Sequence, residues 1–210
     1  FKANTSDEGG AIFQNNAFIK IDGGKFLDNK ASSQGGAILQ ATPAPGPKDA
    51  GGKLTILNSE FITNTAADGA GAIGVYSEAE ITKTSFTNNE STMNQGEGGA
   101  IYVGGWGQLT MKDSSFTGNK GNRGGAIAST NQGQGTPEDP VAYIKLDNVT
   151  FADNIASEEG GAIANYLIGG NGNPNTIKNS TFTGNKAGTK GGAIFNANKA
   201  VLNLEGNNTF

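Results

Sequence analysis

The feature that most constrains the fold is a short phrase that recurs along the whole chain. Seven phrases begin with phenylalanine and end three residues later with asparagine, and each is followed by a glycine-rich step that ends in Ala-Ile. The phrases are Phe1–Asn4, Phe26–Asn29, Phe61–Asn64, Phe86–Asn89, Phe116–Asn119, Phe151–Asn154 and Phe182–Asn185, and Phe210 begins another. The steps are Gly9–Ile12, Gly35–Ile38, Ala70–Ile73, Gly98–Ile101, Gly124–Ile127, Gly160–Ile163 and Gly191–Ile194. The chain is therefore an array of repeats.

Aliphatic residues precede each phrase at a nearly constant distance. Five residues before the phenylalanine stand Ile21, Ile56, Ile81, Met111, Leu146 and Ile177, and six before it stands Leu204. A second aliphatic residue two positions earlier occurs at Ile19, Leu54, Leu109, Ile144 and Leu202. This period-two alternation is typical of a strand with one buried face. Each repeat is thus predicted to hold two or three short strands.

Short strands of this kind bury their apolar face only when equivalent repeats stack, each strand pairing in parallel with its successor. Asn and Gly at fixed positions of the repeat adopt the left-handed or tight backbone conformations that the corners between strands need. Helical repeats would need 3.6-residue periodicity, and a propeller would need four strands in each blade. We therefore predict an all-β parallel β-helix, or β-solenoid, of about seven turns. Residues 1–210 are expected to form a single segment of it, as part of a longer repeat protein.

Composition excludes several classes of site. The chain has no cysteine and no histidine, which removes thiol nucleophiles, imidazole bases and zinc fingers. A net charge of -4 and a single arginine, Arg123, argue against a nucleic-acid surface. No apolar stretch is long enough to span a membrane, so direct membrane insertion by this segment is not expected. We expect no cofactor and no metal.

Two columns of identical residues are predicted to be structural. A row of exposed phenylalanines would aggregate the protein, so the aromatic column is expected in the core. Equivalent asparagines can hydrogen-bond one another up the coil as a ladder. The members are Phe26, Phe61, Phe86, Phe116, Phe151 and Phe182, with Asn29, Asn64, Asn89, Asn119, Asn154 and Asn185.

The acidic pairs Asp7-Glu8 and Glu158-Glu159 immediately precede glycine pairs. In the later turns the same phase holds residues of alternating charge: Glu97, Arg123, Glu159 and Lys190. Alternating charges avoid like-charge contact between neighbouring strands, and exposed pairs of this kind stabilise weakly. A glycosidase would need two carboxylates facing one cleft. No catalytic constellation is visible, and we expect no catalytic residue.

Insertions interrupt one phase of the repeat, after the Ala-Ile strand and before the aliphatic strand. They are Gln40–Gly52, Ser129–Pro140 and Tyr166–Asn175. The four tyrosines and one tryptophan are expected at the same corner: Tyr76, Tyr102, Trp106, Tyr143 and Tyr166. Insertions at one phase decorate one side of a solenoid, and Tyr and Trp are enriched in recognition surfaces. These residues are candidates for a binding surface, although capping of the loops is an equally good interpretation.

The alternation of Phe-x-x-Asn with Gly-Gly-Ala-Ile resembles the chlamydial polymorphic membrane proteins, over the whole chain. The resemblance implies a right-handed β-helical passenger segment of an autotransporter-type protein, displayed on the outer membrane or otherwise extracellular. It implies non-catalytic adhesion, with a host-cell protein or glycan as partner and the repeat motifs themselves implicated. Two alternatives stay open. One is a structural fibre in which the chain binds itself head to tail, and the other is a polysaccharide-active enzyme.

Overall fold

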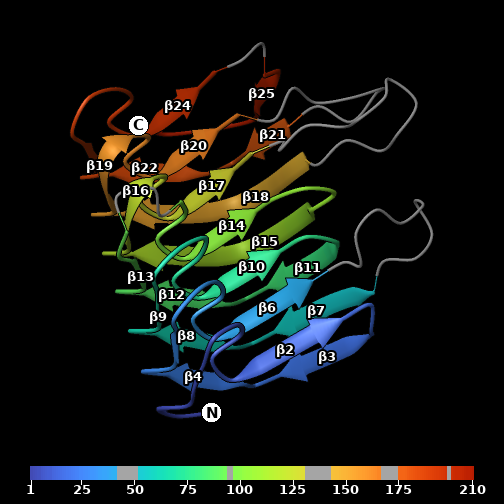
Figure 1. Ribbon diagram of the computed structural model, residues 1–210. Helices are drawn as coiled ribbons and strands as arrows, with labels where there is room; N and C mark the ends of the chain where they lie inside the picture. Colours follow the sequence, from blue (N-terminus) through green and yellow to red (C-terminus); the bar gives the residue numbers. More distant parts are fainter. Residues whose placement is uncertain (42–51, 94–96, 131–142, 167–174, 198–199) are drawn as a thin grey trace.

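The computed structural model describes residues 1–41, 52–93, 97–130, 143–166, 175–197 and 200–210. These residues contain no helix, and their strands stack in parallel into three sheets. The result is a right-handed parallel β-helix that rises from the N-terminus at one end to the C-terminus at the other (Figure 1). Most of each of the three predicted insertions lies outside the described residues. Their described ends place all three between the second and third sheets defined below.

The three sheets correspond to three phases of the repeat. The short sheet holds β1 (Thr5–Ser6), β5 (Lys30–Ala31), β9 (Thr65–Ala66), β13 (Glu90–Ser91), β16 (Lys120–Arg123), β19 (Ile155–Glu159) and β23 (Lys186–Ala187). The Ile sheet follows the glycine pairs and holds β2 (Ile12–Asn15), β6 (Ile38–Ala41), β10 (Ile73–Val75), β14 (Ile101–Val103), β17 (Ile127–Ser129), β20 (Ile163–Asn165) and β24 (Ile194–Asn196).

The third or long sheet carries the aliphatic residues and the phenylalanines. It holds β3 (Ile19–Asp22), β7 (Lys53–Leu57), β11 (Glu78–Thr82), β15 (Gln108–Thr117), β18 (Tyr143–Ala152), β21 (Asn175–Lys178) and β25 (Leu202–Glu205), together with β4 (Lys25–Leu27), β8 (Glu60–Ile62), β12 (Ser85–Thr87) and β22 (Thr181–Thr183). β15 and β18 run through both halves of this sheet, where the turns of β3, β7, β11 and β21 use two strands.

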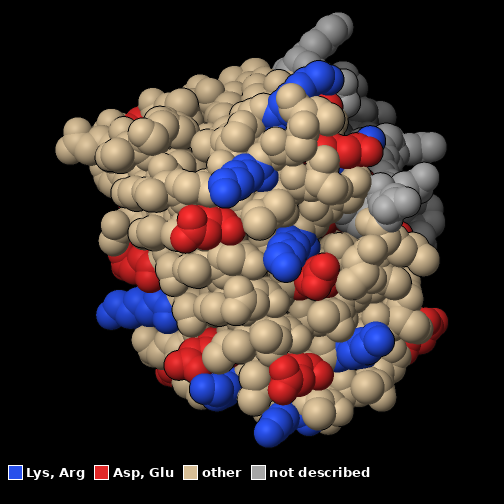
Figure 2. Space-filling model, turned by 90° about the vertical axis from the view of Figure 1, so that its left-hand side faces the viewer, with Lys and Arg blue, Asp and Glu red and all other residues tan. Residues whose placement is uncertain are grey.

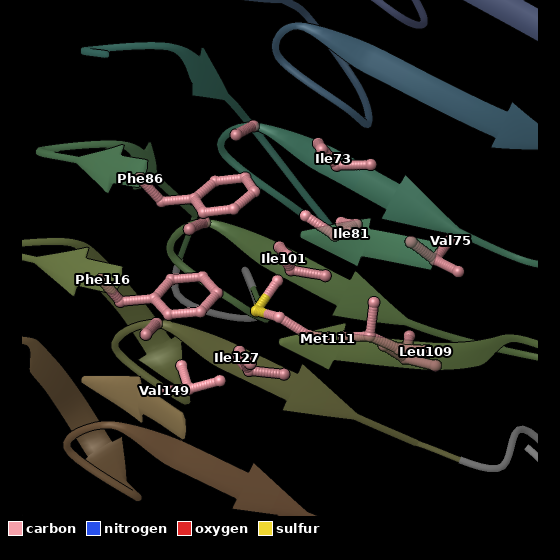
Figure 3. Packing of buried hydrophobic residues seen from close by; sticks show 14 of the residues in the cluster. Ile73, Val75, Ile81, Phe86, Ile101, Leu109, Met111, Phe116, Ile127 and Val149 are labelled. Atoms are coloured by element: carbon pink, nitrogen blue, oxygen red, sulfur yellow. The ribbon is translucent and has the colours of Figure 1, made fainter. Parts of the chain in front are cut away.

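A continuous column of phenylalanine rings fills one side of the interior. Phe26, Phe61, Phe86, Phe116 and Phe151 are fully buried. Neighbouring rings stack almost in parallel, with centroids 4.6 to 5.0 Å apart. Figure 3 shows Phe86 and Phe116 pointing into the coil beside isoleucines of the Ile sheet and the Leu109 and Met111 side chains of β15. Aromatic contacts add to the free energy of burying these side chains, so this column contributes strongly to the stability of the coil.

An asparagine ladder runs beside the phenylalanines. Asn119 Nδ2 donates to Asn154 Oδ1 at 2.9 Å and to the Phe86 carbonyl at 3.0 Å. Asn119 Oδ1 in turn accepts from the side-chain amide and the backbone N–H of Asn89, both at 3.0 Å. The same pattern links Asn29, Asn64, Asn89, Asn119, Asn154 and Asn185. A buried amide with all these partners has no unsatisfied polar group, which is why this polar column is tolerated inside the coil.

The corner before each ladder asparagine uses a left-handed backbone conformation. The third residue of the phrase has a positive φ in Asp28, Thr63, Asn88, Gly118, Asp153 and Gly184. Asn, Asp and Gly adopt this conformation readily, whereas the β-branched Thr63, at φ 51°, is an outlier. The ladder asparagines are therefore fixed by their hydrogen bonds, and the residue before them turns the chain.

The glycine pairs have two different requirements. Gly124 has a φ of +67°, and a Cβ on Gly125 would lie 2.1 Å from the Gly161 carbonyl oxygen of the next turn. The first glycine thus adopts a left-handed backbone conformation, and the second allows the backbone of the next turn to approach closely. In the third turn, where Ala70 occupies the first position, the positive φ moves to Gly69. This shift explains how Gly69-Ala70-Gly71 replaces the usual pair.

Replacing Phe116 by alanine should lower the free energy of unfolding by about 3 to 5 kcal/mol, because the cavity lies between two stacked rings in the middle of the column. Phe18→Ala is the matched control: Phe18 is 82% exposed, and its loss should change stability by less than about 0.5 kcal/mol. Urea unfolding followed by circular dichroism measures both. Equal effects of the two substitutions would contradict the assignment of the column to the core.

Thr63→Asn should stabilise the coil by about 1 kcal/mol, because asparagine tolerates the left-handed conformation that strains a β-branched residue. The reverse change in the next turn, Asn88→Thr, should destabilise it by a similar amount. Both positions have nearly the same φ, 51° and 53°. Midpoints of urea unfolding compare the two variants, and a loss of stability in Thr63→Asn would show that the backbone there is not strained.

Candidate functional site

The column of alternating charges lies where the short sheet leads into the Ile sheet. Arg123 is paired in register with Glu159, and Glu159 forms a bridge with Lys190. The Lys190 ammonium lies 3.1 Å from Glu159 Oε1, whereas Arg123 Nε makes its ion pair with the neighbouring Glu158, at 3.4 Å. Each carboxylate of the Glu158-Glu159 pair thus has its own cation. The face over the short sheet shows the same mixing of both signs (Figure 2).

Glu97 was predicted to belong to these exposed charges, and that prediction is wrong. Its carboxylate is partly buried, makes no ion pair among the described residues, and its Oε2 has no hydrogen-bond partner there. Burial raises the pKa of Glu97 to about 7, and the opposing effect of Arg123 is smaller. The sequence offered no signal for this burial, because Glu97 occupies the same phase as residues that remain in solvent.

Tyr102 lies in the middle of β14 rather than at a corner. It is 3% exposed and belongs to a small apolar cluster with Ala70 and Ala128, separate from the main core. Its hydroxyl lies 2.6 Å from Thr130 Oγ1. Burial raises the pKa of Tyr102 to about 12. A ring this deeply covered stabilises the outer side of the Ile sheet and presents little surface to a partner.

Tyr76 and Tyr166 fold back over the same side of the Ile sheet. The Tyr76 hydroxyl donates to Gln34 Oε1 at 2.6 Å, and its ring meets that of Tyr102 edge-on at 5.7 Å. The Tyr166 hydroxyl donates to Glu159 Oε2, and the Arg123 guanidinium lies 5.5 Å from its ring centroid. The hydrogen bond from Tyr166 lowers the pKa of Glu159. The Tyr166 ring packs against Phe195 instead, with centroids 5.5 Å apart. We name Tyr76, Tyr102 and Tyr166, whose hydroxyls are all paired within the chain, the capping cluster.

Trp106 and Tyr143 remain at the corner between the Ile sheet and the long sheet. Trp106 lies in the turn between β14 and β15 and is half-buried, with no ring contact or hydrogen bond within the described ranges. Tyr143 begins β18, and the Lys145 ammonium lies 4.4 Å from its ring centroid. Both side chains keep part of their aromatic surface in solvent.

Polar residues extend this corner down the long sheet. Tyr143 is in register with Gln108, Gln108 with Glu78, and Glu78 with Lys53. Lys53 Nζ lies 2.9 Å from Glu78 Oε1 and 2.7 Å from Glu80 Oε1, and these hydrogen bonds raise its pKa. We name Lys53, Glu78, Trp106, Gln108 and Tyr143 the corner surface. Sequence reasoning found its aromatic members and missed the polar ones, although their outward phase beside Leu54, Ala79, Leu109 and Ile144 could have indicated them.

The described residues offer no site for a metal or a membrane span. No group of three or more His, Cys, Asp or Glu side chains could hold a metal ion in the part of the chain that is described. The same residues include no helix with the length and apolarity to cross a bilayer. The side chains of the corner surface provide hydrogen bonding, ion pairing and stacking on aromatic faces.

Glu97→Gln should remove a pH dependence of stability. The pKa of Glu97 is about 7 in the folded protein and near 4.5 when unfolded, so between these values the folded state binds more protons. Wild-type stability should therefore fall as pH rises from about 4.5 to about 7 and change little above that. The variant should lose this decrease and be the more stable protein at pH 8. Glu205→Gln, at an exposed position, is the control, and an identical slope in wild type and Glu97→Gln would contradict the burial of the carboxylate.

Comparison with known families identifies the repeat. The model of the Chlamydia polymorphic membrane protein repeat matches residues 83–104, 113–130, 148–166 and 179–197. Each match begins at a residue with positive φ, namely Lys83, Asp113, Asn148 and Asn179. Each ends within two residues of a strand of the Ile sheet. The matches thus omit the corner where the insertions and Trp106 lie. No curated protein and no solved structure matches the chain.

The matched stretches contain the phenylalanine, the ladder asparagine and the Ala-Ile strand of four successive turns. Members of this family are outer-membrane or surface proteins in Chlamydia. The motifs that carried the resemblance in the sequence are therefore the ones that the family model recognises. In these four stretches, the chain matches the repeat of the Chlamydia polymorphic membrane proteins.

Proposed function

We propose that this protein is a non-catalytic, surface-displayed β-helix that adheres to a host-cell protein or glycan through the corner surface. The observation that carries the proposal is that Trp106 and Tyr143 keep aromatic surface in solvent, at the corner that the repeat leaves variable. Variable loops on a rigid scaffold are the usual place for binding residues. The corner surface meets that description.

The scaffold supports this role because its interior is closed. Stacked rings, aliphatic side chains and the asparagine ladder fill the coil. Such a core holds the outward side chains in fixed positions, and preorganised side chains lose less conformational entropy on binding. A rod of this kind serves to present a surface.

The capping cluster is the weaker candidate for adhesion. Tyr102 is almost fully covered, and the hydroxyls of Tyr76 and Tyr166 are paired with Gln34 and Glu159. A partner would have to displace these hydrogen bonds before it could use the same groups. The Tyr143 hydroxyl is likewise paired within the chain, with Thr110, whereas Trp106 makes no hydrogen bond among the described residues. Together with Lys53 and Glu78, Trp106 and Tyr143 combine a partly exposed apolar face with polar groups at the rim, as interface residues generally do.

Replacing Trp106 by Ala and Tyr143 by Thr together should reduce binding of the purified protein to cultured epithelial cells at least fivefold, because the aromatic anchors are lost. Thermal unfolding should change little, since neither side chain belongs to the core cluster. Flow cytometry with fluorescently labelled protein measures the binding.

Ile155→Thr is the matched control, because it removes an apolar side chain that is 42% exposed on the short sheet. It should bind cells like the wild type. Unfolding of the double variant, or undiminished binding by it, would contradict adhesion through the corner surface. In the latter case the outward positions of the repeat motifs would be the next place to look.

A further inference from the structure

A two-row array of hydroxyl groups covers the half of the long sheet that carries the phenylalanines, across the bend from the corner surface. The array occupies the positions that flank each phenylalanine on β12, β15, β18 and β22. In the first row Ser85 pairs in register with Ser115, Ser115 with Thr150, and Thr150 with Thr181. In the second row Thr87 pairs with Thr117, Thr117 with Ala152, and Ala152 with Thr183. We name these residues, apart from Ala152, the hydroxyl face.

These side chains point away from the core. Each lies next to a fully or almost fully buried phenylalanine, and neighbouring residues of a strand face opposite sides of the sheet. Thr117, Thr150 and Thr183 are exposed, and the other members are partly exposed. None of the seven hydroxyls makes a hydrogen bond to another residue within the described ranges. The array therefore presents free donors and acceptors at a regular spacing.

The fold does not require hydroxyls at these positions. In the preceding turns the same two places hold Lys25 with Leu27, and Glu60 with Ile62. Threonine favours strands, but so do valine and isoleucine, and serine has no such preference. Strand formation alone thus leaves the concentration of Ser and Thr in four successive turns unexplained.

A shallow groove adjoins the first row. It has a volume of about 410 Å³, and its walls include Ser85, Ser115, Asn58, Lys83 and Asp113. The last three have positive φ values, so the groove follows the bend between the two halves of the long sheet. A chain-like ligand could lie in this groove along the rod axis and contact the hydroxyls of successive turns.

We propose that the hydroxyl face binds a linear, neutral polysaccharide laid along the axis of the coil. A hydroxyl both donates and accepts hydrogen bonds, as the hydroxyls of a sugar do. Successive turns are about 4.8 Å apart, which is close to the length of one pyranose unit. Neither row contains an ionisable residue, and the charged side chains that line the groove, Glu60, Lys83 and Asp113, are of both signs. No single sign of charge dominates the surface, which favours an uncharged polymer. The rows also lack the aromatic and arginine anchors typical of a protein interface.

Multivalency explains why a polymer is the expected ligand. A single hydroxyl contact contributes little net free energy, because it replaces hydrogen bonds to water. A chain that spans several turns makes each further contact intramolecular, so the contacts reinforce one another. A monosaccharide lacks this advantage. The inference goes beyond the proposed adhesion, because it assigns a second surface and a class of ligand to it.

Two triple variants test the proposal by affinity electrophoresis in gels containing soluble β-1,4-glucan, β-1,3-glucan or mannan. In the first, Thr117, Thr150 and Thr183 are each replaced by Val, which keeps the side-chain shape and removes the hydroxyl. In the second they are each replaced by Ser, which keeps the hydroxyl. We expect at least one polymer to retard the wild-type protein, the Val variant to bind it at least fivefold more weakly, and the Ser variant to remain within twofold. Added salt should change the retardation of the wild-type protein little.

Retardation by none of the three polymers, or equal retardation of the Val variant and the wild type, would overturn the proposal. The proposal would also be overturned if a monosaccharide inhibited polymer binding as strongly as a hexasaccharide at the same concentration. Thermal unfolding of both variants confirms that the coil is intact. The Trp106 and Tyr143 double variant should retain polysaccharide binding, so a failure of the hydroxyl face and a failure of the corner surface give different results.

Discussion

The in-register stacking of equivalent residues is the constraint on which the rest of the structure depends. Each phenylalanine ring stacks on the ring of the next turn, with centroids about 5 Å apart. Each ladder asparagine forms a hydrogen bond of about 2.9 Å with the side-chain amide of the next one. Neither column could form in a single repeat, because each member is satisfied by the turns above and below it. The coil is thus stabilised cooperatively, and identical side chains are an advantage in it.

This stacking separates the residues that build the coil from those that are free to vary. Phase by phase, the inward positions and the left-handed corners are restricted to a few residue types, while the outward positions change from turn to turn. Lys25, Glu60, Ser85, Ser115 and Thr150 occupy one outward column without any effect on register. A scaffold of this kind can carry more than one surface. The corner surface and the hydroxyl face lie on the two halves of the long sheet, one on each side of its bend.

The outer side of the Ile sheet is partly shielded from solvent by side chains of neighbouring turns, although it is not part of the inner core. Tyr102 is covered from outside by Tyr76 and by small residues of neighbouring turns. Glu97 lies beside this cluster and is only partly hydrated, which is why its pKa rises to about 7. The polar groups of Tyr76 and Tyr166 are used within the chain. These residues stabilise the outside of the coil, and Trp106 and Tyr143 form a second group of partly exposed aromatic side chains at the corner.

The sequence by itself determined the parallel β-helix and the phase of its insertions, because a repeated motif must satisfy the same contacts in every turn. The inward place of Phe116 and the hydrogen bonds of Asn119 follow from that repetition. Tertiary structure alone decided how far each outward residue is buried, since this depends on neighbours that belong to other turns and vary in identity. Glu97 and Arg123 share a phase, yet one is partly desolvated and the other forms an ion pair with Glu158. The five Tyr and Trp residues looked equivalent in sequence, but contacts between turns divide them into a capping cluster and a corner surface.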